Sequence, residues 1–166
     1  MTTSSSTGGF TIVELMVTLA VAAILMGFAV PAFNDFVRQR TMSSRINDFV
    51  LAVNYARSEA VRRGEEVRVW ALGGDGDNEW GEGYQVVTVN DPEVLREFAA
   101  FDDATLDASG ALDGRFSLTF NSRGLLIPQG AGAVALCSTV AGVDPGRVVN
   151  FSPLGRPDVE EQPCNP

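Results

Sequence analysis

The chain has 166 residues, of which 21 are acidic and 12 are basic, so its formal net charge is −9. All of the basic residues are arginines, and the chain contains neither lysine nor histidine. The lack of histidine removes the commonest general base and metal ligand, and the acidic balance argues against a broadly basic surface for nucleic acid.

An apolar segment covers residues 15–33 and contains no charged residue. Thr18 has the only side chain in this segment that can form a hydrogen bond. At about 1.5 Å per residue, a helix over this segment is roughly 30 Å long, which matches the hydrocarbon core of a bilayer. A helix also satisfies its own backbone hydrogen bonds inside lipid. We therefore expect a transmembrane helix here.

Glu14 lies directly before this apolar segment, where a carboxylate is costly without a partner. A cleaved secretory signal would begin with a basic region, whereas residues 1–9 contain no arginine or lysine. A simple signal anchor would explain the apolar length but would give no role to Glu14 or to the residues before it. Hydropathy alone does not separate these alternatives.

Residues 9–14 read Gly-Phe-Thr-Ile-Val-Glu, and an apolar helix with Pro31 near its end follows them. This order resembles the N-terminus of type IV prepilins and type II secretion pseudopilins. The resemblance implies that a prepilin peptidase cuts between Gly9 and Phe10 and methylates the new N-terminal Phe10. It also implies that Glu14 pairs with the terminal amine of a neighbouring subunit during assembly. The leader, residues 1–9, lacks the basic residue that such leaders usually carry.

Residues 34–63 are more polar but contain no helix breaker. Apolar residues recur three or four positions apart, as on an amphipathic helix with a narrow buried stripe. The residues of this stripe are Ile46, Phe49, Val50, Val53, Ala56 and Ala60. Gly64 follows two arginines and is a natural C-cap. We therefore predict one helix from about Thr11 to Arg63, membrane-buried in its first half and packed on a domain in its second half.

Residues 64–166 contain short β-like segments separated by Gly, Asp, Asn and Pro. The clearest alternation of apolar and polar residues is in segments 67–72, 84–89 and 115–120, and weaker candidates are 94–98, 133–137 and 147–151. No helical period returns, so we predict an α+β fold, a long N-terminal helix packed on a mainly antiparallel β-sheet. The expected parts are a leader (1–9), a transmembrane and assembly helix (10–33), an amphipathic half-helix (34–63) and a β-rich globular domain (64–166).

Several motifs of this second half follow one another in a set order. They are Trp70, Trp80 with residues 83–87, residues 94–96, residues 120–124, Leu136 with Cys137, and residues 147–156. This order resembles the GspH/FimT branch of pilin-like proteins. With the N-terminal signature, the resemblance covers nearly the whole mature chain. It implies a structural minor pilin or pseudopilin, a low-copy subunit that helps to initiate or tip a filament.

The resemblance also implies partners and a location. The partners are other pilin or pseudopilin subunits, the prepilin peptidase and an inner-membrane assembly platform. The location is a single pass through the inner membrane with a periplasmic C-terminal domain, followed by assembly into a surface or periplasmic fibre. The sequence leaves open whether that fibre is a type IV pilus or belongs to type II secretion. It contains no nucleophile–base pair, phosphate loop or zinc spacing, so we expect no enzyme, cofactor or metal site.

The two cysteines, Cys137 and Cys164, both lie in the C-terminal quarter of the chain. If the membrane helix exports the domain that follows it, they face an oxidising compartment, where a disulfide is expected. The bond would fix the Pro-rich tail, residues 153–166, which we otherwise expect to be mobile.

Acidic residues suggest two further sites, and both have a simpler explanation. Residues 75–82 begin like a calcium loop, but Val86 occupies the position of the bidentate glutamate, so we expect a solvated acidic turn. The neighbours Asp102 and Asp103, like Glu160 and Glu161, point to opposite sides of an extended chain. This geometry argues against a shared acid–base site.

The C-terminal segment around Arg156 bears on DNA binding. Minor pilins of the FimT type that take up DNA carry a Gly-Arg-x-Arg element, whose arginines contact the DNA. Gly155 and Arg156 match this element, but Asp158 replaces the second arginine, and Glu160 and Glu161 follow. One arginine among three carboxylates is a poor phosphate clamp, so we keep DNA binding as the alternative function.

Overall fold

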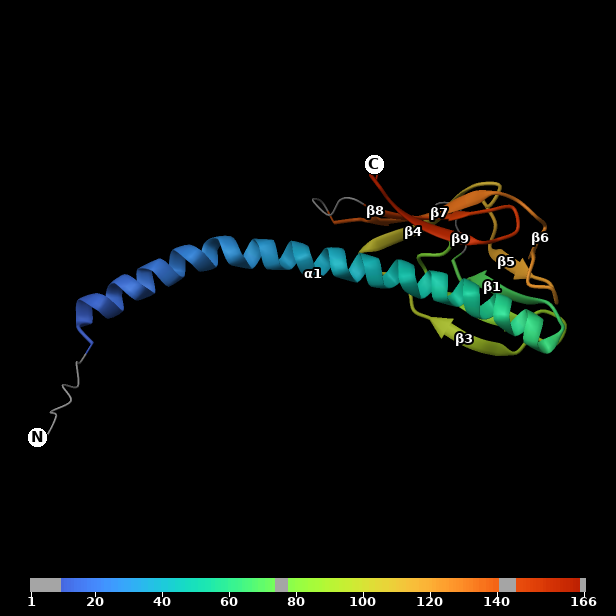
Figure 1. The fold of residues 1–166 in the computed structure, drawn as a ribbon, viewed down its shortest axis with the longest axis horizontal. Coiled ribbons are helices and arrows are strands. Elements are labelled where there is room, and N and C mark those ends of the chain that lie inside the picture. The colour runs from blue at the N-terminus through green and yellow to red at the C-terminus, as the bar shows by residue number, and fades with distance from the viewer. Residues whose placement is uncertain (1–9, 74–77, 141–145, 165–166) are drawn as a thin grey trace, which may run out of the picture. The chain divides into compact units, whose positions relative to one another are not determined.

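The computed structural model describes residues 10–73, 78–140 and 146–164, together with the helix and strands that they form (Figure 1). The chain divides into two compact units, Met1–Arg38 and Gln39–Pro166. The predicted helix is present as α1, Ile12–Arg63. At its start, the amide of Glu14 donates to Thr11 Oγ1 at 3.2 Å, as in an N-cap. At its end, Gly64 has a φ of +72° and donates to Ala60 O at 3.0 Å, as predicted for a glycine C-cap.

The rest of the second unit is built from two antiparallel sheets rather than the single sheet that the sequence suggested. One sheet has the order β3-β2-β1-β5-β6, with bounds Val94–Phe98, Tyr84–Thr88, Val67–Ala71, Ser117–Phe120 and Leu126–Ile127. The other has the order β4-β7-β8-β9, with bounds Ala104–Gly110, Gly132–Ser138, Gly146–Phe151 and Pro157–Gln162. All six segments predicted as strands contain a strand, and β4, β6 and β9 were not predicted.

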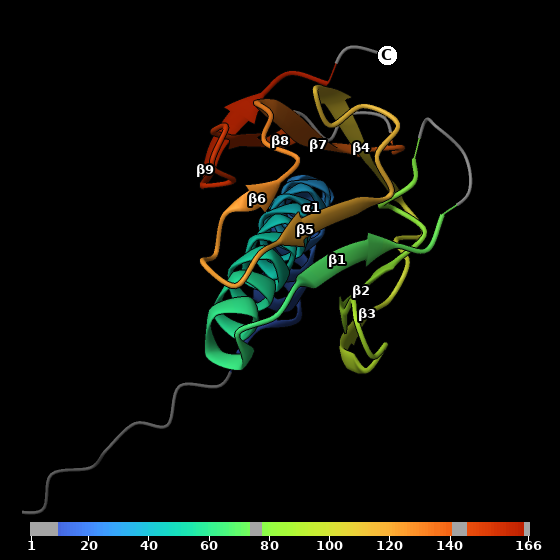
Figure 2. The ribbon, with the colours of Figure 1, turned by 90° about the vertical axis from the view of Figure 1, so that its right-hand side faces the viewer.

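The core lies between the second half of α1 and the inner faces of the two sheets. Figure 2 shows this part of α1 end-on, with strands of both sheets curving around it. Phe49 of α1 is at its centre. The Phe49 ring meets the rings of Trp80, Tyr84 and Phe151 edge to face, with centroid distances of 5.5, 5.3 and 6.4 Å. The helix stripe predicted from the sequence therefore does join the helix to the domain.

Two polar segments differ from what the sequence suggested. The tail, which the disulfide was expected to fix, also forms a strand that was not predicted: β9 pairs along its whole length with β8, from Pro157 opposite Phe151 to Gln162 opposite Gly146. Its charged side chains concealed a strand, because an edge strand leaves most of its side chains in water. The acidic turn was expected to be solvated, but Glu79 and Trp80 are fully buried. Residues 74–77 of that turn, and with them the start of the suggested calcium loop, lie outside the described residues.

Candidate functional site

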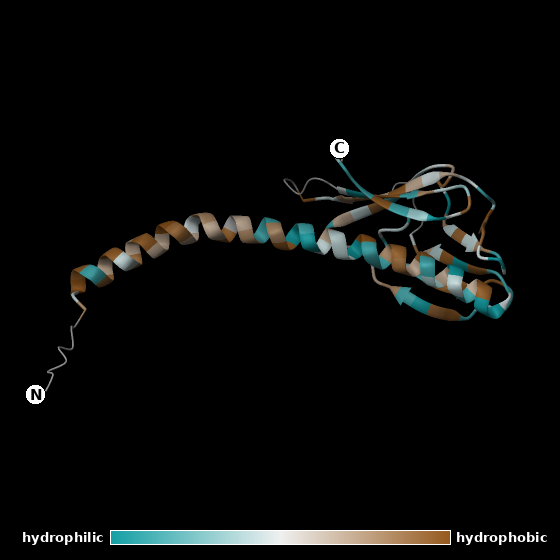
Figure 3. Cartoon of the chain, viewed as in Figure 1, coloured by the Kyte–Doolittle hydropathy of each residue, from teal (hydrophilic) through white to brown (hydrophobic). Residues whose placement is uncertain are grey.

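The first candidate site is the apolar part of α1. This stretch is long and apolar enough to cross a membrane, and none of it is buried within the structure. Figure 3 shows the apolar residues as a nearly continuous band along the first half of the helix. Its large exposed side chains include Leu15, Met16, Val17, Leu19, Val21, Ile24, Leu25, Met26, Phe28, Val30 and Phe33. A surface of this kind needs lipid or other apolar helices around it, because water does not solvate it.

Phe10 and Glu14 of the N-terminal signature lie at the beginning of this helix. Phe10 precedes the first turn and is 78% exposed. Glu14 is in the first turn, where the positive end of the helix dipole favours a carboxylate. Within the described part of the chain, the Glu14 carboxylate forms no ion pair. Gly9, the predicted residue before the cleavage point, lies outside the described residues.

The second candidate site is the loop between β8 and β9, which contains Arg156. Arg57 of α1 reaches this loop, where its guanidinium donates to the carbonyl oxygens of Gly155 and, at 3.4 Å, Leu154. The same guanidinium lies 5.2 Å from the ring centroid of Phe120. No sequence pattern indicated this arrangement, because Arg57 and the loop are almost a hundred residues apart.

Gly155 permits this close approach of helix and loop. Its φ is +80°, a conformation that side chains with a Cβ rarely adopt. A Cβ atom on Gly155 would lie 2.7 Å from Leu126 Cβ and 3.3 Å from Arg57 Nη2. Packing alone therefore accounts for the glycine of the matched Gly-Arg pair.

The charges around Arg156 are mixed. Burial lowers the pKa of Arg57 below its ordinary value, and the nearby positive charge of Arg156 lowers it further. Past Arg156, however, the chain enters the acidic strand β9. There Glu161 forms an ion pair with Arg147 at 2.8 Å, and Glu160 accepts a hydrogen bond from Asn150 at 3.2 Å. Arg57 is held by backbone carbonyls, so Arg156 is left as the exposed cation of this loop.

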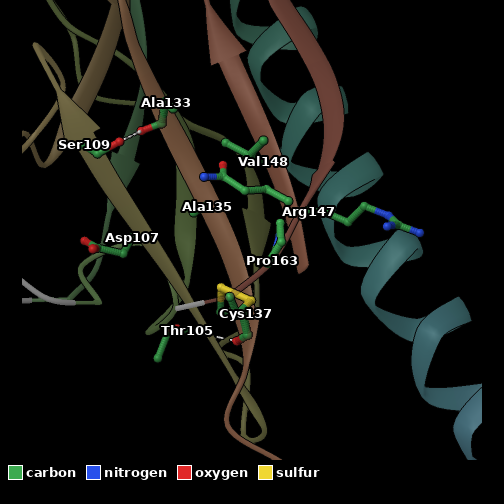
Figure 4. Close-up of a pocket in the computed structure, with 11 residues that line it drawn as sticks. Thr105, Asp107, Ser109, Ala133, Ala135, Cys137, Arg147, Val148 and Pro163 are labelled. Carbon is green, nitrogen blue, oxygen red and sulfur yellow. Dashed lines mark hydrogen bonds between the residues drawn. A yellow bond between two sulfur atoms is a disulfide. The ribbon is translucent and has the colours of Figure 1, made fainter. Parts of the chain in front are cut away.

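A cavity of about 310 Å³ lies on the outer face of the sheet β4-β7-β8-β9 (Figure 4). Its walls are Thr105, Asp107 and Ser109 of β4 and the tail near the Cys137–Cys164 disulfide. Between these walls, the cavity is lined by the small and apolar side chains of Ala133, Ala135 and Val148. In the cavity lining the hydroxyl groups of Thr105 and Ser109 donate to the carbonyl oxygens of Cys137 and Ala133. No cluster of three metal-ligating side chains occurs in the described part of the chain.

The disulfide joins the end of the tail to β7, as expected for cysteines in an oxidising compartment. Glu160 and Glu161 are directed to different partners, Asn150 and Arg147, as expected for adjacent residues of a strand.

An apolar, exposed N-terminal helix that continues into the core of an antiparallel β domain defines a pilin-like protein. The model of the Type II transport protein GspH family matches residues 45–155, and that of the prokaryotic N-terminal methylation motif matches residues 4–30. The chain therefore belongs to the GspH family. It is a membrane-anchored pilin or pseudopilin subunit with an N-methylation motif, and this family is structural rather than enzymatic.

Solved structures agree with this assignment. The type IV minor pilin FimU of Pseudomonas aeruginosa is 28% identical, with a TM-score of 0.61 over 75% of this chain and 92% of that chain. The minor pseudopilin EpsH from the Type 2 Secretion System of Vibrio cholerae has a TM-score of 0.54 over 72% of this chain and 95% of that one. At 12% identity, this second likeness concerns the fold alone.

Curated relatives match only a short segment of the chain. The Type IV major fimbrial protein FimA of Dichelobacter nodosus is 41% identical over 39 residues, which are 24% of each chain. The chain thus spans about a quarter of the length of the curated relatives that it matches. The family and the fold predicted from the sequence are confirmed. The cleavage point, the role of Glu14, the domain limits and the role of Arg156 stay predictions.

Proposed function

We propose that this chain is a minor pilin that is cut by a prepilin peptidase and incorporated into a type IV pilus, in its initiation or tip complex. The observation that carries the proposal is the unburied apolar half of α1, with Glu14 in its first turn. Each large apolar side chain that leaves water contributes about 1.5–3 kcal/mol. The helix therefore needs lipid before assembly and the helices of neighbouring subunits after it.

Glu14 gives this assembly its direction. A carboxylate at the edge of the apolar part of a bilayer is costly, and the cost falls when a cation lies beside it. Removal of the leader would expose the amine of Phe10 as such a cation at the start of every subunit helix. The Glu14 carboxylate of an incoming subunit then has a partner only when its helix is aligned with that of a neighbour.

The other partners and the location are those that the pilin family implies. A prepilin peptidase and an inner-membrane assembly platform act on the anchored subunit. The disulfide supports a periplasmic position for the C-terminal domain, because disulfides persist in oxidising compartments.

The kind of fibre is inferred from the relatives. Identity to the type IV minor pilin FimU is 28%, whereas identity to the pseudopilin EpsH is 12%. This difference favours the pilus over a type II secretion fibre, which is the alternative. DNA uptake is the second alternative, and it depends on Arg156 alone because Arg57 is held by carbonyl groups.

The test compares Glu14→Ala with Asp35→Ala in a cell that lacks the native subunit. Asp35 is an exposed carboxylate further along the same helix, so its variant controls for loss of charge. We expect both variants in the membrane, but about tenfold less Glu14→Ala protein in sheared fibres, which corresponds to about 1.4 kcal/mol of lost pairing. Incorporation of Glu14→Ala at the wild-type level would contradict the assembly role. Loss of secretion instead of pili in the deletion strain would favour the pseudopilin.

A further inference from the structure

The segment between β1 and β2 is attached to the edge of the second sheet. The amide of Trp80 donates to Leu106 O at 3.3 Å, and the amide of Leu106 donates to Asn78 Oδ1 at 2.8 Å. The Trp80 ring is fully buried and packs on Phe49 of α1. These contacts fix the backbone on both sides of Glu79, and they place Glu79 beside strand β4.

Glu79 is an unusual residue for this position, because its side chain is fully buried. Neither of its carboxylate oxygens has a hydrogen-bond partner of good geometry in the described part of the chain. Among the charged groups around Glu79, the carboxyl group of Asp107 has the largest effect on its pKa. Asp107 is the residue after Leu106 on β4. Two ionised carboxylates only accept hydrogen bonds, so this pair can be bonded only when one of them carries a proton.

The surroundings of Glu79 favour that proton. Together, the surroundings raise the pKa of Glu79 to about 7. Burial is the largest cause, a hydrogen bond with its own backbone amide opposes it, and the negative charges of Asp107 and Asp113 act in the same direction as burial. Asp107 belongs to β4 and Asp113 to the turn that follows it. The described charged groups that act on Glu79 are thus carboxylates.

A metal ion is the other cation that could neutralise such a pair. Calcium takes six to eight oxygen ligands, and even a small site usually combines several carboxylates. The described residues contain no group of three metal-ligating side chains. A proton needs only one oxygen from each of two carboxyl groups, so the geometry favours the proton.

We propose that Glu79 and Asp107 form a proton-binding pair that holds the Trp80 segment on β4, and that this attachment weakens when the pair loses its proton. In the unfolded chain Glu79 has its ordinary pKa of 4.5. The folded state therefore binds the extra proton between about pH 4.5 and pH 7. The stabilisation is fully present below pH 4.5 and is lost as the pH rises through 7.

The test is urea unfolding of the full, unreduced chain in detergent micelles, followed by tryptophan fluorescence between pH 5 and pH 8.5. We expect the unfolding equilibrium constant to rise about 100-fold over this range, as expected for a group whose pKa differs by about 2.5 units between the two states. In Glu79→Gln the neutral amide should remove most of this rise and make the variant more stable than wild type at pH 8.5. The matched control is Glu82→Gln, an exposed carboxylate in the same segment, which should keep the wild-type profile.

A flat wild-type profile, or an unchanged slope in Glu79→Gln, overturns the proposal. If Glu79→Gln does not fold, Asp107→Asn answers the same question, because its amide can donate to ionised Glu79 and should reduce the slope. An unchanged slope in Asp107→Asn then overturns it. Calcium added at pH 8.5 should have no effect. If calcium restores the stability found at pH 5, the pair binds a metal ion and the proposal is wrong.

Discussion

Phe49→Ala should cause the largest loss of stability among simple substitutions in α1. Phe49 is fully buried and is the point where the helix meets both sheets. Its ring contacts Tyr84 of β2, Phe151 of β8 and Trp80 of the segment fixed to β4. Truncation therefore opens a cavity in the middle of the core and removes three edge-to-face contacts at once.

The expected cost follows from these contacts. A buried phenylalanine replaced by alanine costs about 3–5 kcal/mol, and the value rises when rigid surroundings prevent the cavity from closing. Three of the walls are aromatic rings from different elements, so we expect about 4–5 kcal/mol. A domain of this size has a free energy of unfolding of about 5–15 kcal/mol, so the variant should be close to the limit of folding.

The assay is urea unfolding of the full chain in detergent at pH 5, with the disulfide intact. Leu51→Ala is the control, because Leu51 lies two residues further along the helix and is 45% exposed. It should cost less than about 1 kcal/mol, as expected for a side chain that is already half solvated. A cost below about 2 kcal/mol for Phe49→Ala, or equal costs for the two variants, would refute the central role of Phe49.

Three further predictions concern processing, oxidation and DNA. The mature chain should begin with N-methylated Phe10 after cleavage at Gly9, as checked by mass spectrometry of membrane-extracted protein; an intact leader would contradict this. Thiol titration of the unfolded, unreduced chain should find no free thiol, and Ser at both Cys137 and Cys164 should cost about 3 kcal/mol. Two reactive thiols per chain would disprove the bond. A short DNA duplex should bind more weakly than about 10⁻⁴ M at physiological salt, because one arginine neutralises too few phosphates. Micromolar binding that disappears in Arg156→Gln would favour DNA uptake over the proposed assembly function.

Local signals explain what could be predicted from the sequence. The limits of α1 follow from Thr11 before the first turn and Gly64 after the last one, both of which act through neighbouring backbone groups. The inner stripe of the helix follows from its spacing alone. Strand β1 alternates clearly because its outer face remains in contact with water.

The missed strands have the opposite character. β4 reads Ala-Thr-Leu-Asp-Ala-Ser-Gly, a sequence of low intrinsic strand propensity that forms a strand through its pairing with β7. β9 carries several charges and forms the outer edge of its sheet, where charged side chains prevent unwanted strand pairing. In both strands tertiary pairing decides the structure, and a single sequence does not contain that information.

The need for tertiary contacts also explains why the sequence pointed to other pairs of carboxyl groups than Glu79 and Asp107. Adjacent acidic pairs are visible in the sequence, but neighbours on a strand point apart. Glu79 and Asp107 come together only because a connecting segment crosses the edge of the other sheet. A sequence pattern of acidic residues therefore did not reveal the Glu79–Asp107 pair, although it did draw attention to the segment that contains Glu79.

Two buried glutamates give the domain opposite responses to pH. Hydrogen bonds from Arg62 and Arg63 lower the pKa of Glu59 to about 2, and Arg63 also bridges to Glu93 at 2.8 Å, beside β3. A lowered pKa stabilises the fold above about pH 4.5, and this contribution is lost as the pH falls toward 2. Glu79 acts in the other direction, because its contribution is lost as the pH rises through 7. Since the two windows do not overlap, stability should be greatest near pH 4.5–5, where Glu59 is ionised and Glu79 still carries its proton.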